Sequence, residues 1–145
     1  ALTAFIPMLM DTGGNSGSQA CVSIIRGISL NEIEFRDLGR VVWKEIRVSV
    51  LCGVCLAIAC FAKIIVVDML LLKSESVTYL VAFVVCATMA VTVCLAKIVG
   101  STLPLLAKKL GFDPAVMASP IITTIVDFLS LLVYFAFATA MLGIG

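Results

Sequence analysis

Residues 115–145, AVMASPIITTIVDFLSLLVYFAFATAMLGIG, contain a single charged residue, Asp127. A helix needs about 20 mainly apolar residues to cross the roughly 30 Å of hydrocarbon in a lipid bilayer. This segment meets both requirements, so it predicts a membrane-spanning helix over about 115–143. The fold therefore has to be one that satisfies its backbone inside lipid.

Three further stretches have the length of a membrane span. Residues 48–72 and 77–99 are strongly apolar, and neither carries more than two charged residues. Residues 1–26 have polar side chains in their middle but are long enough to cross. Because α-helices satisfy their own backbone hydrogen bonds in lipid, we expect residues 1–145 to form one transmembrane ion-transport domain. Its predicted fold class is all-α, a polytopic helical bundle with four spans.

The composition excludes several classes of function. Hydrophobic residues make up 62% of the chain and charged residues only 13%, too few to coat a water-soluble core of this size. The net charge of +1 argues against a nucleic-acid partner bound by bulk electrostatics. The chain has no histidine, which excludes zinc hydrolases and histidine-based catalytic triads. We expect a protein that is not an enzyme and whose surroundings are a lipid bilayer.

The basic residues predict the orientation in the membrane. Lys and Arg are enriched in cytoplasmic connectors. Here they gather between the first and second spans and between the third and fourth: Arg26, Arg36, Arg40, Lys44 and Arg47, then Lys97, Lys108 and Lys109. We therefore expect a multi-pass protein of the cell membrane, with both basic connectors cytoplasmic and the C-terminus outside. The N-terminus is then also outside, and a chain that opens on Ala1 without a signal peptide is expected to be a piece of a longer protein.

The long connector after the first span has a helical pattern of its own. Asn31 followed by Glu34 is a capping-box pattern, and apolar residues recur behind it at helical spacing. This predicts an amphipathic helix over about 30–46 along the cytoplasmic interface, with Trp43 at headgroup level. A solvated charged turn that only sets the topology fits the same residues.

All six cysteines fall within predicted spans: Cys21, Cys52, Cys55, Cys60, Cys86 and Cys94. Cys52 and Cys55 share a helix face, but a metal site needs further ligands at the same depth and there is no histidine to supply one. We interpret the thiols as small apolar packing residues.

The first span presents two different sides. Gly13 and Gly17 form a G-x-x-x-G spacing, which favours close helix packing. The roughly opposite side contains Gly14 and a stripe of polar residues at a spacing of four: Asp11, Asn15 and Gln19. A polar stripe at membrane depth needs water, an ion or a protein partner against it.

Asp127 is the most informative residue of the chain, because its span places it near the middle of the membrane. Burying a carboxylate there costs about 2.5–3.5 kcal/mol even on lenient scales, so it normally faces a cavity or a cation. Ser119 and Thr123 precede it by two turns and one turn on the same face. A buried ion pair with Lys63 and a proton relay are alternative roles. Asp11 reaches a similar depth from the opposite side.

A cation pathway fits these side chains best. Carboxylate, hydroxyl and amide oxygens are hard ligands that suit Mg²⁺, Mn²⁺ or Ca²⁺ rather than soft metals. One Asp127 per chain is little charge for a divalent ion, and a homodimer with two copies of Asp127 facing one another across its two-fold axis supplies two. Because Mg²⁺ loses its waters reluctantly, we expect these carboxylates to hold it in hydrated form.

Two motifs resemble the MgtE magnesium transporter family and the related solute carrier family 41. They are residues 7–19, PMLMDTGGNSGSQ, and residues 118–127, ASPIITTIVD. The motifs stand in the family's order on the corresponding helices, and the resemblance covers essentially the whole chain. It implies a homodimer with five spans per chain, of which four are visible here. It also implies a pore at the two-fold axis, lined by the first and fourth visible spans.

The resemblance assigns roles to individual residues. Asp127 matches the pore acid that holds hydrated magnesium, Thr123 and Ser119 match the pore wall, and Asn15 and Gly14 match the facing helix. The role of Asp11 as a second acid is inferred from its position alone.

Together these features predict transport of a divalent cation. Mg²⁺ is the expected ion, with Mn²⁺, Co²⁺ and Ca²⁺ as further ions that the same ligands suit. Two alternatives remain open from the sequence: a proton-coupled exporter of small molecules and a membrane scaffold subunit that conducts no ion.

Overall fold

The computed structural model describes residues 2–71, 73, 75, 78–117 and 119–143, without the side chains of residues 2, 117, 119 and 142. The described part consists of helices joined by short turns and contains no strand, so the all-α class is confirmed. Its long helices are α1 (Ile6–Ser29), α2 (Leu38–Lys63), α3 (Tyr79–Lys109) and α4 (Ser119–Leu142). Four short helical segments accompany them: 3-10 helices at Leu2–Phe5, Phe35–Asp37 and Pro114–Met117, and a π-helix, η3, at Ile64–Leu71 that continues α2.

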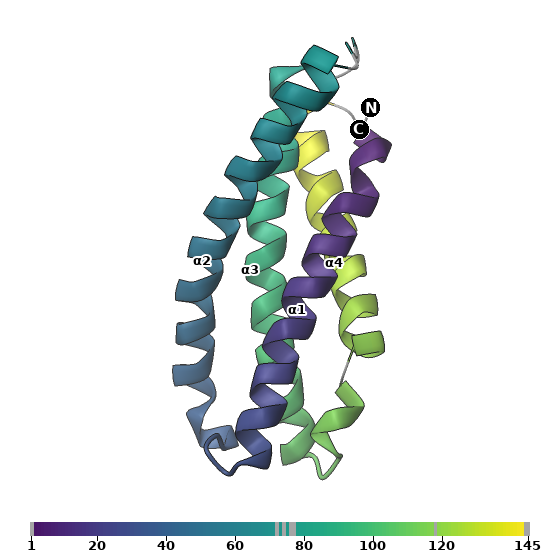
Figure 1. Ribbon diagram of the computed structural model, residues 1–145. Coiled ribbons are helices and arrows are strands. Elements are labelled where there is room, and N and C mark those ends of the chain that lie inside the picture. The colour runs from purple at the N-terminus through teal and green to yellow at the C-terminus, as the bar shows by residue number, and fades with distance from the viewer. Residues whose placement is uncertain (1, 72, 74, 76–77, 118, 144–145) are drawn as a thin grey trace.

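The bundle is organised around α3. Helices α1, α2 and α4 all pack on α3, and α1 also packs on α4. Successive long helices run in opposite directions, so the α1–α2 and α3–α4 connectors lie at one end of the bundle and both chain ends lie at the other (Figure 1). The largest cluster of buried apolar side chains joins α3 to the three other helices in the half of the bundle near the chain ends.

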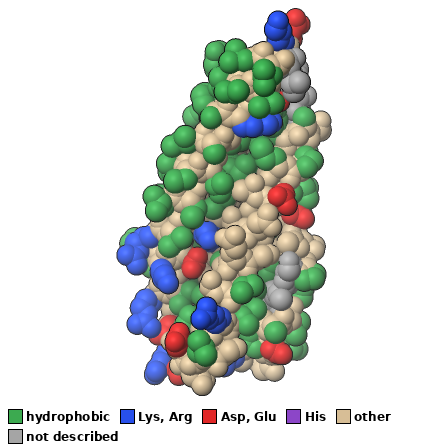
Figure 2. All heavy atoms as spheres, viewed as in Figure 1, with side chains coloured by type: hydrophobic (Ala, Val, Ile, Leu, Met, Phe, Trp, Pro, Cys, Tyr) green, Lys and Arg blue, Asp and Glu red, His purple; other side chains and the backbone are tan. Residues whose placement is uncertain are grey.

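Three helical segments within the described residues are long and apolar enough to cross a membrane: Phe35–Leu71, Tyr79–Lys109 and Pro120–Met141. Helix α1 is not among them, because the polar residues in its middle lower its hydropathy. The outward face of the second helix and its π-helical extension is apolar, as lipid contact requires. Its exposed side chains include Val50, Leu51, Val54, Ile58, Phe61, Val66 and Leu70. In Figure 2, which is seen from the same direction as Figure 1, Lys and Arg side chains gather toward the connector end of the bundle.

The predicted interfacial helix over 30–46 is wrong as a separate element. Residues 38–46 are the first turns of α2, and the chain between α1 and α2 is a turn followed by one 3-10 segment. The capping box forms three residues later than predicted, between Glu34 and Asp37. Asn31 instead adopts a left-handed conformation, with φ of 59°, which ends the helical course of α1.

Two span boundaries also differ from the prediction. Helix α2 begins ten residues earlier than residue 48, and α3 continues ten residues beyond residue 99. Pro104 lies buried inside α3 and does not end it. An internal proline loses one helical hydrogen bond, and packing of the surrounding turn against neighbouring helices offsets that loss. As a consequence Lys97 belongs to the interior of a helix and not to a connector.

The predicted packing face of α1 is confirmed. A Cβ atom on Gly13 would lie 2.7 Å from Cγ2 of Thr92, and one on Gly17 would lie 3.0 Å from Cγ2 of Ile122. The absence of side chains here lets α1 approach both α3 and α4 closely. The backbones of α1 and α3 also come close at Gly17 and Gly100, where a Cβ on Gly100 would overlap the Gly17 carbonyl oxygen. The small residues therefore set the position of α1 in the bundle.

The six cysteines, all among the described residues, form no disulfide. Cys21, Cys60 and Cys86 are buried among apolar side chains, as predicted. Cys55 differs, because it is exposed on α2, and Cys52 and Cys94 are half-buried.

Candidate functional site

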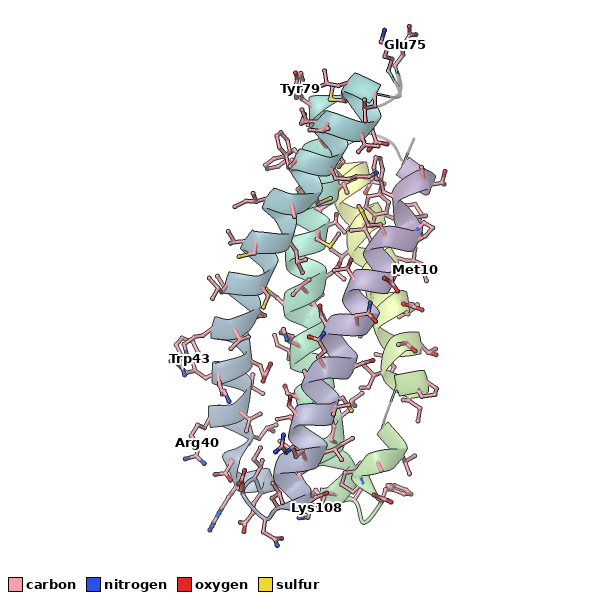
Figure 3. All side chains as sticks on the ribbon, in the orientation of Figure 1. Met10, Arg40, Trp43, Glu75, Tyr79 and Lys108 are labelled. Carbon is pink, nitrogen blue, oxygen red and sulfur yellow. The ribbon has the colours of Figure 1, made fainter. Side chains whose placement is uncertain are left out.

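The polar side of α1 and the acidic face of α4 form one cavity. Its volume is about 270 Å³. It is lined by Met10, Asp11, Gly14, Asn15, Thr123 and Asp127. The structure thus brings together five of the six residues that the sequence predicted for the site. Met10, labelled in Figure 3, marks the level of the cavity on the side of α1 that faces α4.

The sixth predicted residue is Ser119. It is the first residue of α4, one helical turn before Thr123, but its side chain lies outside the described part of the structure.

Asp127 is half-buried at the wall of the cavity and forms no ion pair within the described residues. The alternative, structural role for Asp127 is a buried ion pair with Lys63. Its ammonium instead lies 2.8 Å from Oδ2 of Asp68, across the start of the π-helical segment. The alternative of an Asp127–Lys63 ion pair is therefore wrong. No basic side chain of the described residues therefore occupies the carboxyl group that Asp127 presents to the cavity.

Asp11 lies on the opposite wall and is exposed. The side-chain amide of Asn15 donates a hydrogen bond of 3.3 Å to Oδ2 of Asp11, four residues earlier on α1. This contact turns the amide nitrogen toward the carboxylate and leaves the Asn15 carbonyl oxygen as an acceptor for other donors. The α1 wall thus presents carboxylate and amide oxygens.

Thr123 of α4 packs against α1 at Gly14, which has no side chain to displace it. A Cβ on Gly14 would lie 3.3 Å from Cγ2 of Thr123 and 4.0 Å from Oδ1 of Asp127. The Thr123 hydroxyl donates to the carbonyl of Pro120 at 3.2 Å. Pro120 is the second residue of α4, where its missing N–H costs no helical hydrogen bond. Gly14 and the first turn of α4 together set the width of the cavity.

The cavity has the chemistry and size for a hydrated divalent cation. Its polar atoms are hard oxygens from two carboxylates, a hydroxyl and an amide. Six waters at about 30 Å³ each occupy roughly 180 Å³, less than the volume of the cavity. Among the residues that the structure describes, no three Asp, Glu, Cys or His side chains form a cluster, so a cage that strips the ion of its water is not formed by this chain alone.

Comparison with known proteins agrees with this geometry. A family described as divalent cation transporter, MgtE, matches residues 6–137. The chain belongs to the MgtE family. It is 35% identical to the magnesium transporter MgtE of Bacillus subtilis over 142 residues, covering 98% of the chain. It is 34% identical over 142 residues to the protein of that name from Thermus thermophilus, again covering 98% of the chain.

Membership of the MgtE family places the chain in a group of transporters and not of enzymes. Together with the apolar helices, it identifies a multi-pass membrane protein. The chain spans about 30% of the length of these two MgtE relatives.

Sequence reasoning missed the positions of two residues, Met10 and Lys97. Met10 lines the cavity beside Asp11, and its position four residues before Gly14 on the same helix could have indicated this. Lys97 was assigned to a connector, although it is buried in α3 and only 7% exposed. No local signal distinguishes a lysine at the end of an apolar run from one whose helix continues through a proline.

Proposed function

We propose that this chain is the transmembrane, ion-conducting part of a magnesium transporter. The observation that carries the proposal is the single cavity in which α1 and α4 place Asp11, Gly14, Asn15, Thr123 and Asp127 together. Hard oxygen ligands and space for a complete hydration shell suit Mg²⁺ bound through its waters. Mn²⁺, Co²⁺ and Ca²⁺ are expected to compete for the same cavity.

The position of the cavity supports a homodimer. Asp11 and Asn15 are exposed on the face of α1 beside α4, at a depth where lipid would otherwise meet them. Polar groups in a membrane need a protein or water partner. A second copy related by a two-fold axis would cover this face and bring a second Asp127 to the axis, which doubles the charge available to one ion. Ser119, one turn before Thr123, would extend the wall of the same pore toward the connector end.

The orientation follows from the basic residues at the connector end. Arg40 and Lys108 lie at that end of the bundle, whereas Glu75 lies at the other (Figure 3). With the positive end in the cytoplasm, both connectors are cytoplasmic and the C-terminus is outside. In this arrangement α1 crosses the membrane beside α3 and α4 as a fourth span, because they shield its packing face from lipid.

Uptake into lipid vesicles tests the proposal. The full-length protein that contains this chain is reconstituted, and entry of Mg²⁺ is followed with a magnesium-sensitive dye inside the vesicles. We expect uptake down a magnesium gradient above that of protein-free vesicles. Flux that follows a pH gradient whether or not Mg²⁺ is present would contradict the proposal and favour a proton-coupled exporter. Absence of any flux would favour a scaffold.

Asp11→Asn is expected to weaken magnesium uptake without abolishing it. The change removes one of two carboxylates at the cavity, but this one is exposed and screened, so the apparent affinity should fall by roughly twofold to fivefold. The dose–response of uptake measures the effect. Glu75→Gln, which removes an exposed acid at the end of the bundle away from the basic connectors, is the matched control. If Asp11→Asn behaves as the wild type, Asp11 is not a second acid of the site.

Gly14→Ala is expected to lower the rate of uptake severalfold while the protein still folds. The added methyl group would press on Thr123 and enter the space beside Asp127. A contact of this length requires a shift of only a few tenths of an ångström, so the main effect is a narrower passage. Gly39→Ala, where no atom lies within 4 Å of the new Cβ, is the control. Equal rates in the two variants would show that Gly14 does not limit the width of the pathway.

A further inference from the structure

A second and larger cavity lies between α1 and α2 and adjoins the first at Asn15. Both helices pack on α3, and the space between them has a volume of about 550 Å³. We call it the α1–α2 groove. Its α1 wall includes Asn15 and Gln19, its α2 wall includes Leu51 and Leu56, and Lys97 of α3 lies at its floor.

Lys97 is a buried cation with no anionic partner in the described part of the chain. It is 7% exposed, and the ion pairs that the structure shows involve Arg36, Arg40 and Lys63 instead. Glu45 of α2 is also buried, at 8% exposed, and lies near the level of Lys97, but it forms no ion pair with Lys97 and does not line the groove. A buried ammonium is strongly unfavourable unless an anion meets it. The side chains that line the groove thus include Lys97 but no acid.

The groove has a polar wall on α1 and an apolar wall on α2. It is lined on α1 by Thr12, Asn15, Ser16 and Gln19, and on α2 by Leu51, Cys52, Cys55 and Leu56. Gly53 packs on Ala90, and because α2 runs antiparallel to α3, Leu56 comes about level with residue 87 of α3. At 1.5 Å per residue, about 15 Å separates that level from Lys97. This is half of the roughly 30 Å of hydrocarbon in a bilayer, the depth of one leaflet.

The Lys97 end of the groove lies on the side of the basic connectors. By the same antiparallel register, Lys97 is about one helical turn from the level of Trp43, which is 60% exposed on the outer face of α2 (Figure 3). Tryptophan favours the headgroup level of a membrane. A lipid in the leaflet at this end would have its phosphate near Lys97 and its acyl chains pointing toward Leu56.

We propose that the α1–α2 groove binds an anionic phospholipid of the leaflet at the connector end. The phosphate is held by Lys97, with the Gln19 amide as a further donor, and one acyl chain lies along Leu51 and Leu56. The buried positive charge disfavours a divalent cation in this groove, so its ligand differs from that of the cavity at Asp127, which it adjoins at Asn15. A soluble anion would satisfy Lys97 but would leave the apolar α2 wall of the groove uncovered.

Lipid-dependent thermal stabilisation tests this site. The full-length protein in detergent is titrated with phosphatidylglycerol, and its melting temperature is followed. We expect the melting temperature to rise with phosphatidylglycerol but not with phosphatidylcholine or inorganic phosphate. For Lys97→Gln the concentration needed should increase about tenfold, the loss of one charge-assisted contact. Lys108→Gln, an exposed lysine of the same helix, should titrate as the wild type.

Several results would overturn the proposal. Equal titrations of the wild type and Lys97→Gln would exclude Lys97, and equal losses in Lys97→Gln and Lys108→Gln would indicate unspecific attraction to charge. Stabilisation by inorganic phosphate alone would identify a soluble anion in place of a lipid.

A second pair of variants tests the groove if Lys97→Gln does not fold. Cys55→Trp places a bulky side chain in the groove from an exposed position on α2, and should remove the response to phosphatidylglycerol. Ile58→Trp, 66% exposed on α2 and outside the groove, should keep it. If Cys55 of the full-length protein in lipid-free detergent is protected from a maleimide, another protein segment fills the groove and the lipid proposal is wrong.

Discussion

Asp127→Asn is expected to abolish magnesium uptake by reconstituted vesicles while the protein keeps its fold and its oligomeric state. Asparagine has nearly the same shape and still accepts a hydrogen bond, so the walls of the cavity stay in place. What is lost is the negative charge, and in the proposed dimer both copies lose it at once. Two charge-assisted contacts to the hydration shell are then weakened, which predicts a fall in uptake of about a hundredfold or more.

The structure makes this a clean test of charge at one position. Asp127 forms no ion pair in the described residues, so its neutralisation leaves no cation without a partner. Asp68→Asn would be a poor control, because Asp68 holds Lys63 at 2.8 Å. Glu75→Gln is the better one, since it removes an exposed acid at the end of the bundle away from the connectors. Uptake by Asp127→Asn at the wild-type rate, with an unchanged elution volume, would exclude Asp127 from the pathway.

Much of the candidate site could be predicted because helical periodicity is local. Asp11, Gly14 and Asn15 share one side of a helix wherever that helix lies in the fold. Thr123 and Asp127 likewise share a side, because they are one turn apart. A charge within an apolar run marks such a side as one that faces water or protein. That α1 and α4 face each other came from the family resemblance, and the cavity between them agrees with it.

The predictions that were wrong concern features that depend on contacts between distant segments. The third span was predicted to end at residue 99, where its apolar stretch ends, but packing on α1 and on the segment Pro114–Met117 carries α3 to Lys109. The error moved Lys97 out of the bundle and so concealed the α1–α2 groove. The capping box was likewise placed three residues early, because Asn31 and Glu34 match the pattern as well as Glu34 and Asp37 do.

Gly100→Ala is expected to destabilise the bundle by about 1–3 kcal/mol or more, the range for overpacking a close contact. The new Cβ would overlap the carbonyl oxygen of Gly17 and lie 3.2 Å from Cβ of Ala20. The obstacle is backbone, so no side chain can rotate away and α1 as a whole has to move off α3. That movement carries the α1 wall of the cavity away from α4, so uptake should fall together with the melting temperature.

Gly39→Ala separates this steric effect from the general effect of replacing glycine in a helix. Gly39 lies in the first turn of α2 with no atom within 4 Å of the added Cβ, so alanine there should leave stability unchanged or raise it by up to about 1 kcal/mol. Both variants are compared by thermal unfolding in the same detergent. A melting temperature of Gly100→Ala at or above that of Gly39→Ala would mean that α1 does not approach α3 this closely. The shared position of Asp11 and Asp127 at one cavity would then also be wrong, because it depends on the same placement of α1.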